Sequence, residues 1–257
     1  SSRAPSEGAL NREGGGAGVS GPMGEAPAPM KLGPLKEWVS SRGAPRCGLV
    51  WLHGLGDDEE GWADQMEDDF PVAPGLGPCK FILPRAPVQA VGCNDGDRCT
   101  SWFDMKSIPV GGPPDHGCSL EQALQTSARV HAAIDRLEKD GIPVERIMVG
   151  GFSQGGAMSI LSAITYPRRL AGVICLSGIV FFDPDKLAQP HCKGMDIFWG
   201  HGTEDDVLEV GLQAEGVAVL SAAGFKVQAK QYRAPHAPTP KEMEDASAFF
   251  AACLGAS

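Results

Sequence analysis

The sequence lacks the features that mark several large classes of protein. No stretch approaches the ~20 consecutive apolar residues of a membrane-spanning helix. Lys and Arg number 22 against 32 Asp and Glu, a formal net charge of −10, which leaves too little basic surface for a nucleic-acid binder. The eight cysteines form no CxxC pair and no repeating spacing. We therefore expect no nucleic-acid partner, no bound metal, and reduced thiols in a cytoplasmic protein.

Glycine and proline are unevenly distributed along the chain. They occupy 13 of the first 34 positions, and this stretch has no apolar segment of the kind found in secretory signal peptides. Such a composition cannot bury enough apolar surface to offset the entropy of ordering, so we expect residues 1–34 to be a disordered tail. The remainder, residues 35–257, has the composition of a soluble globular protein and the length of one domain.

Apolar runs alternate with amphipathic segments along this domain. The runs, which have the continuous hydrophobicity of strands buried on both faces, are residues 47–53, 80–83, 146–150, 172–177, 196–199 and 226–232. Helical periodicity marks residues 120–139, 207–223 and 240–254, and Ser119 with Gln122 is a candidate capping box for the first of these. The alternation predicts an α/β fold with a mostly parallel sheet and helices on both faces.

One short motif suggests a nucleophile. Gly151-Phe-Ser153-Gln-Gly155 matches G-x-S-x-G, follows an apolar run and precedes a stretch of small residues suited to a helix. In a nucleophile elbow the serine lies in a strained strand-to-helix turn, and the glycines allow the strand and helix to approach closely. We interpret Ser153 as a catalytic nucleophile rather than as part of a plain turn.

A second glycine-rich loop is a candidate for the other half of an oxyanion hole. His53-Gly-Leu55-Gly follows the first apolar run. In this architecture one oxyanion donor is the N–H of the residue after the nucleophile, and the other comes from a loop after an earlier strand. We therefore assign the oxyanion hole to the backbone N–H groups of Gln154 and Leu55.

A serine nucleophile needs a histidine base and a carboxylate to orient that base. In α/β-hydrolases the chain order is serine, acid, histidine. Of the histidines after Ser153, only His236 also follows the acidic loop 201–206 and a further apolar run. The order rule selects His236 as the base and Asp205 or Asp206 as the acid.

Together these strings resemble one family. HGLGD (53–57), SWFD (101–104), GGFSQGGAMS (150–159), LAGV (170–173), LSG (176–178) and HGTEDD (201–206) are similar to the acyl-protein thioesterases, which are small lysophospholipase- and carboxylesterase-like α/β-hydrolases. The resemblance implies an α/β-hydrolase fold without a large cap domain and no cofactor. By this resemblance, the catalytic acid of the family corresponds to Asp205, four residues after His201. The resemblance also implies cleavage of palmitoyl thioesters on membrane-associated proteins.

The resemblance leaves the substrate and the rim of the site open. A carboxylesterase or lysophospholipase acting on small or lipid esters is the alternative, and a non-catalytic lipid-binding module is a rival that the complete Ser-His-Asp set disfavours. The expected partners are S-acylated proteins or ester substrates, with at most transient, peripheral membrane contact, in a monomer or weak homodimer. Trp102, Met105 and Ile108 lie in the stretch that we expect to form the rim of an acyl channel, although its aromatic residues could equally be core.

Overall fold

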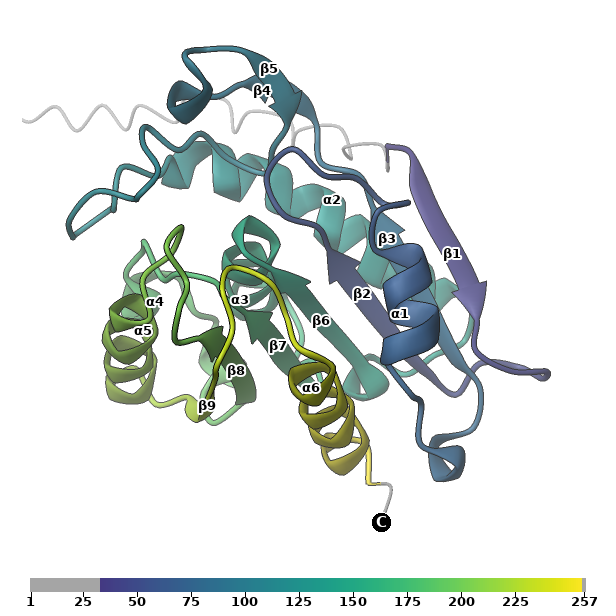
Figure 1. The fold of residues 1–257 in the computed structure, drawn as a ribbon. Coiled ribbons are helices and arrows are strands. Elements are labelled where there is room, and N and C mark those ends of the chain that lie inside the picture. Colours follow the sequence, from purple (N-terminus) through teal and green to yellow (C-terminus); the bar gives the residue numbers. More distant parts are fainter. Residues whose placement is uncertain (1–32, 256–257) are drawn as a thin grey trace, which may run out of the picture.

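The computed structural model describes residues 33–255, which form a seven-stranded sheet flanked by helices (Figure 1). The strand order is β1-β3-β2-β6-β7-β8-β9, and every neighbouring pair is parallel except β1 with β3. The strands are β1 (Leu35–Val39), β2 (Cys47–Leu52), β3 (Cys79–Pro84), β6 (Ile147–Phe152), β7 (Gly172–Leu176), β8 (Asp196–Gly202) and β9 (Lys226–Tyr232). A separate hairpin, β4 (Val88–Ala90) with β5 (Arg98–Thr100), projects beside the sheet.

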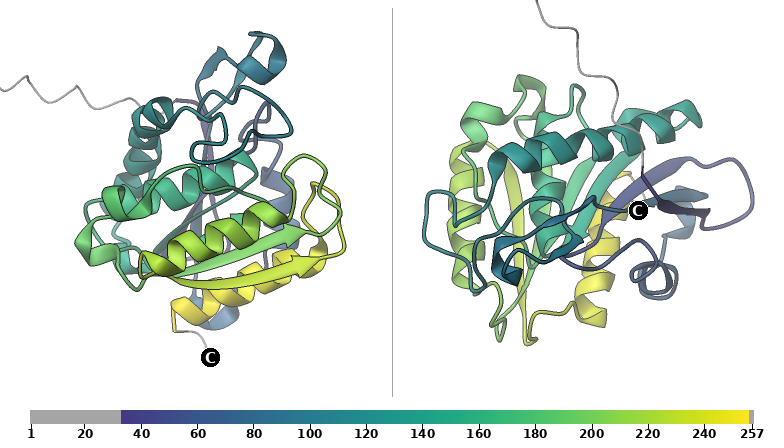
Figure 2. Two further views of the ribbon diagram at one scale, coloured as in Figure 1. Left: turned by 90° about the vertical axis from the view of Figure 1, so that its left-hand side faces the viewer. Right: turned by 90° about the horizontal axis from the view of Figure 1, so that it is seen from above.

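Helices cover both faces of the sheet, as Figure 2 shows from two further directions. The helices are α1 (Ala63–Asp69), α2 (Leu120–Lys139), α3 (Gln154–Thr165), α4 (Pro184–Leu187), α5 (Gly211–Ala222) and α6 (Pro240–Cys253). Residues of α2, α3 and α5 share one hydrophobic cluster, and residues of α1 and α6 share the other. The α/β-hydrolase fold with a mostly parallel sheet, predicted from the sequence, is confirmed.

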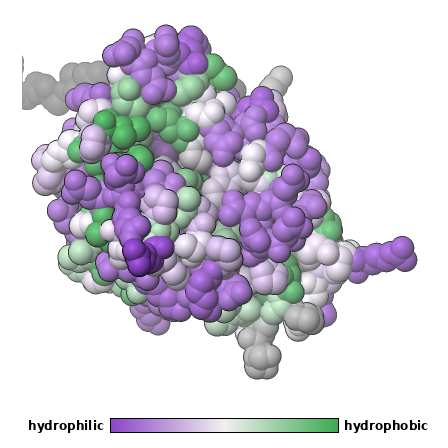
Figure 3. Space-filling view, viewed as in Figure 1, coloured by the Kyte–Doolittle hydropathy of each residue, from purple (hydrophilic) through white to green (hydrophobic). Residues whose placement is uncertain are grey.

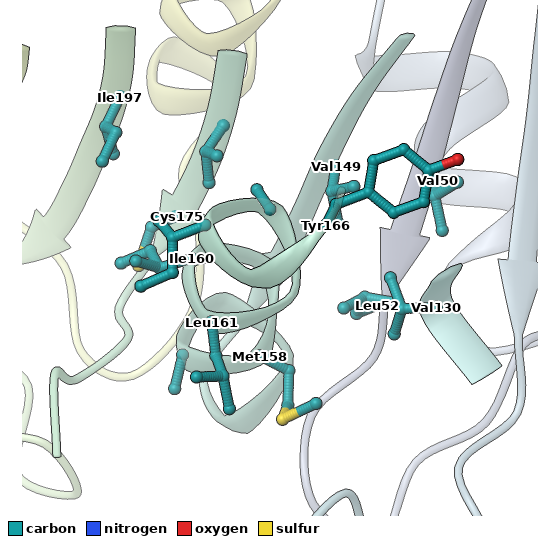
Figure 4. Packing of buried hydrophobic residues seen from close by; sticks show 14 of the residues in the cluster. Val50, Leu52, Val130, Val149, Met158, Ile160, Leu161, Tyr166, Cys175 and Ile197 are labelled. Carbon is teal, nitrogen blue, oxygen red and sulfur yellow. The ribbon is translucent and has the colours of Figure 1, made fainter. Parts of the chain in front are cut away.

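The two clusters follow from the alternation of side chains along each strand. On β2, Val50 and Leu52 belong to the cluster under α2 and α3, whereas Leu49 and Trp51 belong to the cluster under α1 and α6. Because both faces of β2 are buried, its sequence is a continuous apolar run and does not alternate between apolar and polar residues. Figure 4 shows the first cluster, in which Ile160 of α3 lies beside Cys175 of β7.

The predicted elements differ from the observed ones in several places. The run 226–232, expected to be buried on both faces, is the partly exposed edge strand β9. The helix expected at 207–223 begins only at Gly211, because the preceding residues form a turn. The capping box at Ser119 is half formed: Ser119 accepts the N–H of Gln122, but the Gln122 side chain accepts the N–H of Asp104 instead of returning to Ser119. The sequence patterns also missed β1, α1 and the β4–β5 hairpin.

The boundary of the predicted tail can be examined only at its end. Residues 1–32, the main part of the predicted tail, lie outside the described part of the chain. Gly33 and Pro34, which the prediction placed in the tail, are described, and the Pro34 carbonyl accepts the N–H of Arg85 at 2.9 Å. The chain therefore already contacts the domain one residue before β1.

Parallel strands bring their carboxyl ends to one edge of the sheet, which is where ligands of open α/β sheets bind. The loop after β2, the turn after β6 and the loops after β8 and β9 meet at this edge. These four connections carry all the residues that the sequence analysis assigned to catalysis and to the oxyanion hole.

Candidate active site

Ser153 lies in a sharp turn between β6 and α3. Its backbone is at φ 56° and ψ −121°, a region that side-chain-bearing residues rarely adopt. The flanking glycines make the turn possible: a Cβ on Gly151 would lie 2.5 Å from the Gly155 carbonyl oxygen, and a Cβ on Gly155 would collide with the carbonyl oxygen of Leu52. The motif thus has the geometry that the G-x-S-x-G spacing predicts.

Ser153, His236 and Asp205 form one hydrogen-bonded chain. Ser153 Oγ lies 2.9 Å from His236 Nε2, and His236 Nδ1 lies 2.7 Å from Asp205 Oδ2. With the imidazole neutral, its Nδ1–H donates to the carboxylate and its Nε2 accepts from the serine hydroxyl. Segments separated by up to 83 positions in the sequence therefore meet in the arrangement that a nucleophile, a base and an orienting acid require.

Of the two adjacent aspartates, Asp205 is the one that contacts His236. The Asp205 side chain is fully buried, and its Oδ1 accepts the N–H groups of Val207 and Leu208 at 3.0 and 2.8 Å. Burial would raise the pKa of Asp205, but the hydrogen bonds from His236 and from these backbone groups outweigh it and hold the pKa below its ordinary value. Asp206 is exposed.

His201 supports the turn that carries the acid. It is fully buried, and its Nε2–H donates to the Leu208 carbonyl at 2.7 Å, while Asp205 Oδ2 lies 3.5 Å from the same nitrogen. Burial lowers the pKa of His201, so its ring stays neutral. His201 lies near the end of β8, and the histidine that contacts Ser153 is His236.

The pocket beside Ser153 has a volume of about 320 Å³. Its apolar lining comes from Leu55, Trp62, Ile108, Phe152 and Val207, and its polar lining includes Ser153, His236, Asp57 and Gln65. The surface in Figure 3 is mostly hydrophilic, with an apolar area beneath the hydrophilic tip of the β4–β5 hairpin. A larger cavity of about 730 Å³ lies between β1 and α1 and contains none of these polar groups.

The two predicted oxyanion donors flank the serine. Gly54, the residue before Leu55, lies against Ser153, so that a Cβ on Gly54 would be 3.5 Å from the serine Cβ. Gln154 is the first residue of α3, where backbone N–H groups have no partner within the helix. Within residues 33–255, neither the Leu55 N–H nor the Gln154 N–H donates a hydrogen bond. Both N–H groups are therefore free to donate a hydrogen bond.

The predicted rim residues are only partly at the pocket. Ile108 lines it and is 43% exposed. Trp102 is fully buried and Met105 nearly so, and neither lines the pocket, so the structure does not place them at its rim. The physical reason is that the chain after β5 enters the core beneath α2, where the Thr126 hydroxyl donates to the Trp102 carbonyl.

Two residues that line the pocket, Phe152 and Trp62, were not predicted from the sequence. Phe152 lies on the wall with its ring centroid 4.7 Å from that of His236 and 5.5 Å from that of Trp62. The signal for Phe152 was its position in the motif, because a residue next to an elbow serine lies at the carboxyl end of the strand. Trp62 lies just before α1 and carried no comparable signal.

The described residues hold no cluster of three or more His, Cys, Asp or Glu side chains suited to a metal ion. Within the same residues, no helix is long and apolar enough to cross a membrane.

Comparisons with known proteins agree with this geometry. The family model described as phospholipase/carboxylesterase matches residues 36–254. Acyl-protein thioesterase 1 of Cryptococcus neoformans is 34% identical over 239 residues, covering 84% of this chain and 95% of that protein. Carboxylesterase SOBER1 of Arabidopsis thaliana is 34% identical over 191 residues, covering 73% of this chain and 81% of that protein.

Solved structures extend the similarity to the fold. The crystal structure of Arabidopsis thaliana SOBER1 superposes with a TM-score of 0.74 at 30% identity, covering 81% of this chain and 99% of that one. Zea mays acyl-protein thioesterase 2 gives a TM-score of 0.71 at 27% identity, covering 86% and 99%. With its elbow serine and hydrogen-bonded histidine, the chain belongs to the phospholipase/carboxylesterase family of serine hydrolases.

Proposed function

We propose that this serine hydrolase cleaves acyl thioesters, with palmitoyl groups on protein cysteines as the physiological class of substrate. The observation that carries the proposal is the Ser153–His236–Asp205 chain beside an open, largely apolar pocket. An acyl chain can lie along the apolar wall while the leaving group extends toward solvent. The proposal assigns Ser153, His236 and Asp205 as the catalytic residues.

The first half of the reaction forms an acyl-enzyme. Ser153 Oγ attacks the thioester carbonyl carbon as its proton passes to His236 Nε2. The carbonyl oxygen gains a negative charge, which the N–H groups of Leu55 and Gln154 stabilise at the N-terminus of α3. The tetrahedral intermediate then expels the cysteine sulfur, which takes the proton from His236, and the acyl group remains as an ester on Ser153.

The second half returns the enzyme to its starting state. Water attacks the acyl ester while His236 Nε2 accepts its proton, and the same two N–H groups stabilise the second oxyanion. Collapse of this intermediate returns the proton to Ser153 Oγ and releases the fatty acid. Asp205, held ionised by its hydrogen bonds, stabilises the imidazolium that forms in each half and fixes its orientation.

The named relatives support a thioesterase but also supply the second candidate. Acyl-protein thioesterase 1 of Cryptococcus neoformans and of Mycosarcoma maydis align over 84% and 80% of this chain. SOBER1, named a carboxylesterase, aligns over 73%. A thiolate, with a parent thiol pKa of about 8.5, leaves more readily than an alkoxide. Cleavage of a thioester therefore depends less on proton donation from His236 to the leaving group.

A comparison of substrates tests the proposal. Turnover is measured for a palmitoyl-thioester peptide, the matching palmitoyl oxyester peptide, a lysophospholipid and p-nitrophenyl esters of several chain lengths, with Ser153→Ala as background. We expect the palmitoyl thioester to give the highest kcat/KM, about tenfold or more above the oxyester. A palmitoyl-thioester rate at the Ser153→Ala background, with rapid cleavage of esters, would favour the carboxylesterase instead.

A further inference from the structure

The peptide unit between Gly54 and Leu55 is held from its carbonyl side. The His53 ring lies with Nδ1 2.7 Å from the Gly54 carbonyl oxygen and Nε2 3.0 Å from the Ala86 nitrogen. Because the Ala86 N–H can only donate, Nε2 accepts and the ring proton is on Nδ1, which donates to Gly54. Burial lowers the pKa of His53, which keeps the ring in this neutral form.

The geometry of a trans peptide makes this contact relevant to catalysis. The carbonyl and the N–H of one peptide unit point in opposite directions. Fixing the Gly54 carbonyl toward His53 therefore fixes the Leu55 N–H in the opposite direction, on the side of the chain where Leu55 lines the pocket with Ser153. The hydrogen bond to the carbonyl also polarises the peptide and strengthens its N–H as a donor.

Trp102 connects this peptide to the other oxyanion donor. Its indole Nε1–H donates to the His53 carbonyl at 2.9 Å, and its backbone N–H donates to Gln154 Oε1 at 2.8 Å. The Gln154 amide nitrogen in turn donates to the Phe103 carbonyl at 2.7 Å. Trp102, Phe103 and Gln154 are all buried, so these bonds are shielded from water. The segment 101–103 thus bridges the loop that carries Leu55 and the helix that begins with Gln154.

We propose that His53 and Trp102 are positioning residues that hold the N–H groups of Leu55 and Gln154 in a fixed position relative to each other. His53 orients the Leu55 N–H, and Trp102 couples the His53–Leu55 loop to Gln154. Neither side chain lines the pocket, so both act through the backbone. The inference rests on the proposed acyl-transfer function but not on the choice between thioester and ester.

Trp102→Phe tests the coupling because it keeps most of the aromatic volume and removes the indole donor. We expect kcat for p-nitrophenyl acetate to fall about 10- to 100-fold. This fall is no larger than the fall in kcat that removal of a whole oxyanion donor causes. KM should stay within threefold, since the oxyanion forms only in the transition state. The rate constant for inactivation by a fluorophosphonate, whose phosphoryl oxygen enters the oxyanion hole, should fall in parallel. The pH profile of kcat should keep its shape.

The chain offers a matched control for this substitution. Trp199 is also fully buried, but its indole nitrogen has no hydrogen-bond partner among the described residues. Trp199→Phe therefore makes the same change of volume in the same core without removing a bond. We expect it to leave kcat and the inactivation rate within about twofold of wild type.

His53 provides a second pair of variants that does not depend on the tryptophan. Asn at this position places an amide N–H near the former Nδ1 and can still donate to the Gly54 carbonyl, whereas Leu, of similar size, cannot. Both lose the contact with Ala86. We expect His53→Asn to retain at least five times more kcat than His53→Leu at equal melting temperature.

The outcomes separate the inference from the proposed function. If the fluorophosphonate does not label wild-type Ser153, the catalytic assignment itself fails. If wild type is labelled but Trp102→Phe reacts as fast as Trp199→Phe, or His53→Asn is no better than His53→Leu, the positioning role is overturned and the hydrolase assignment stands. A fall of kcat and inactivation rate in Trp102→Phe with unchanged KM, together with rescue by Asn at position 53, supports it.

Discussion

Two aspartates follow β8 side by side, and their surroundings differ completely. Asp205 is enclosed and receives hydrogen bonds from His236, Val207 and Leu208. Asp206 is exposed, and no hydrogen bond from its side chain to another described residue is present. Neighbouring residues on a turn point in different directions, so an imidazole can meet only one of them. The role of the acid thus depends on where the turn places each carboxylate and not on its chemical type.

Exchange of each carboxylate for an amide separates the two roles. Asp205→Asn should lower kcat on the order of 10³- to 10⁴-fold, because an amide favours the wrong tautomer of His236. Asp206→Asn, the matched control, should stay within about twofold of wild type. Steady-state kinetics of the two purified variants checks the expectation. Comparable losses in both variants would contradict the assignment of Asp205.

At the scale of elements, the start of α6 contains a carboxylate with unusual titration. Glu242 is 1% exposed and forms a capping box with Thr239: its N–H donates to the threonine hydroxyl at 3.1 Å, and its side chain accepts the Thr239 N–H at 3.4 Å. Its other carboxyl oxygen has no partner among the described residues. Burial raises the pKa of Glu242 to about 7, more than the hydrogen bond from Thr239 lowers it.

This raised pKa predicts how stability depends on pH. The native state keeps the Glu242 proton up to about pH 7, whereas the unfolded chain releases it near the ordinary pKa of about 4.3. The contribution of this group is therefore complete below about pH 4.3 and is lost as the pH rises toward 7. The loss is on the order of 3–4 kcal/mol in the free energy of unfolding.

Glu242→Gln removes the titrating proton and should flatten the fall in stability between pH 4.5 and pH 8. Glu244→Gln, on the exposed side of the same helix, is the control and should leave the fall unchanged. Urea unfolding at several pH values measures both. An equal pH dependence of wild type and Glu242→Gln would show that the carboxyl of Glu242 ionises normally in the folded protein.

The elements that the sequence predicted are those with a strong local signal. The elbow has glycines on both sides of Ser153, and the neighbouring strands are apolar throughout because both of their faces are buried. In contrast, β1 (LKEWV) is a short edge strand that carries charges, and α1 (ADQMEDD) buries only Ala63 and Met66. Their hydrophobic patterns were too weak to distinguish them from loops.

Only those parts of the site that are marked by a short motif or by the order of residues along the chain could be predicted from the sequence. Ser153, His236 and the oxyanion loop follow from local strings and from their order along the chain. The position of Trp102 could not be predicted, because an aromatic residue in a loop has the same pattern whether it faces solvent or the core. The bond from its indole to the His53 carbonyl joins residues 49 positions apart, which no local pattern contains.

At the scale of the whole molecule, the domain begins close to the active-site edge of the sheet. The Pro34 carbonyl accepts the N–H of Arg85, and Ala86, the next residue, donates to the His53 ring. Along β1, Trp38 stacks on Phe81 with ring centroids 4.8 Å apart, and Glu37 forms ion pairs with Arg136 and Lys80. The first strand is therefore an integrated part of the domain.

Two truncations test where the domain starts. Removal of residues 1–32 should leave kcat/KM for a soluble ester within about twofold, because the removed segment is polar and rich in glycine and proline. Removal of residues 1–39 also takes away β1 and should destabilise the protein by roughly 3 kcal/mol or more. Kinetics and thermal unfolding of both variants measure this. A tenfold loss of kcat/KM in the shorter truncation would contradict it and show that the segment contributes to the site.

The central claim is that Ser153 carries the acyl group during thioester hydrolysis. The most direct measurement is mass spectrometry of the protein quenched during turnover of a palmitoyl-thioester peptide, followed by localisation of the added mass. We expect a palmitoyl ester on the peptide that contains Ser153, and neither this adduct nor turnover above background in Ser153→Ala. A palmitoyl group on another residue, or turnover by Ser153→Ala at the wild-type rate, would contradict it.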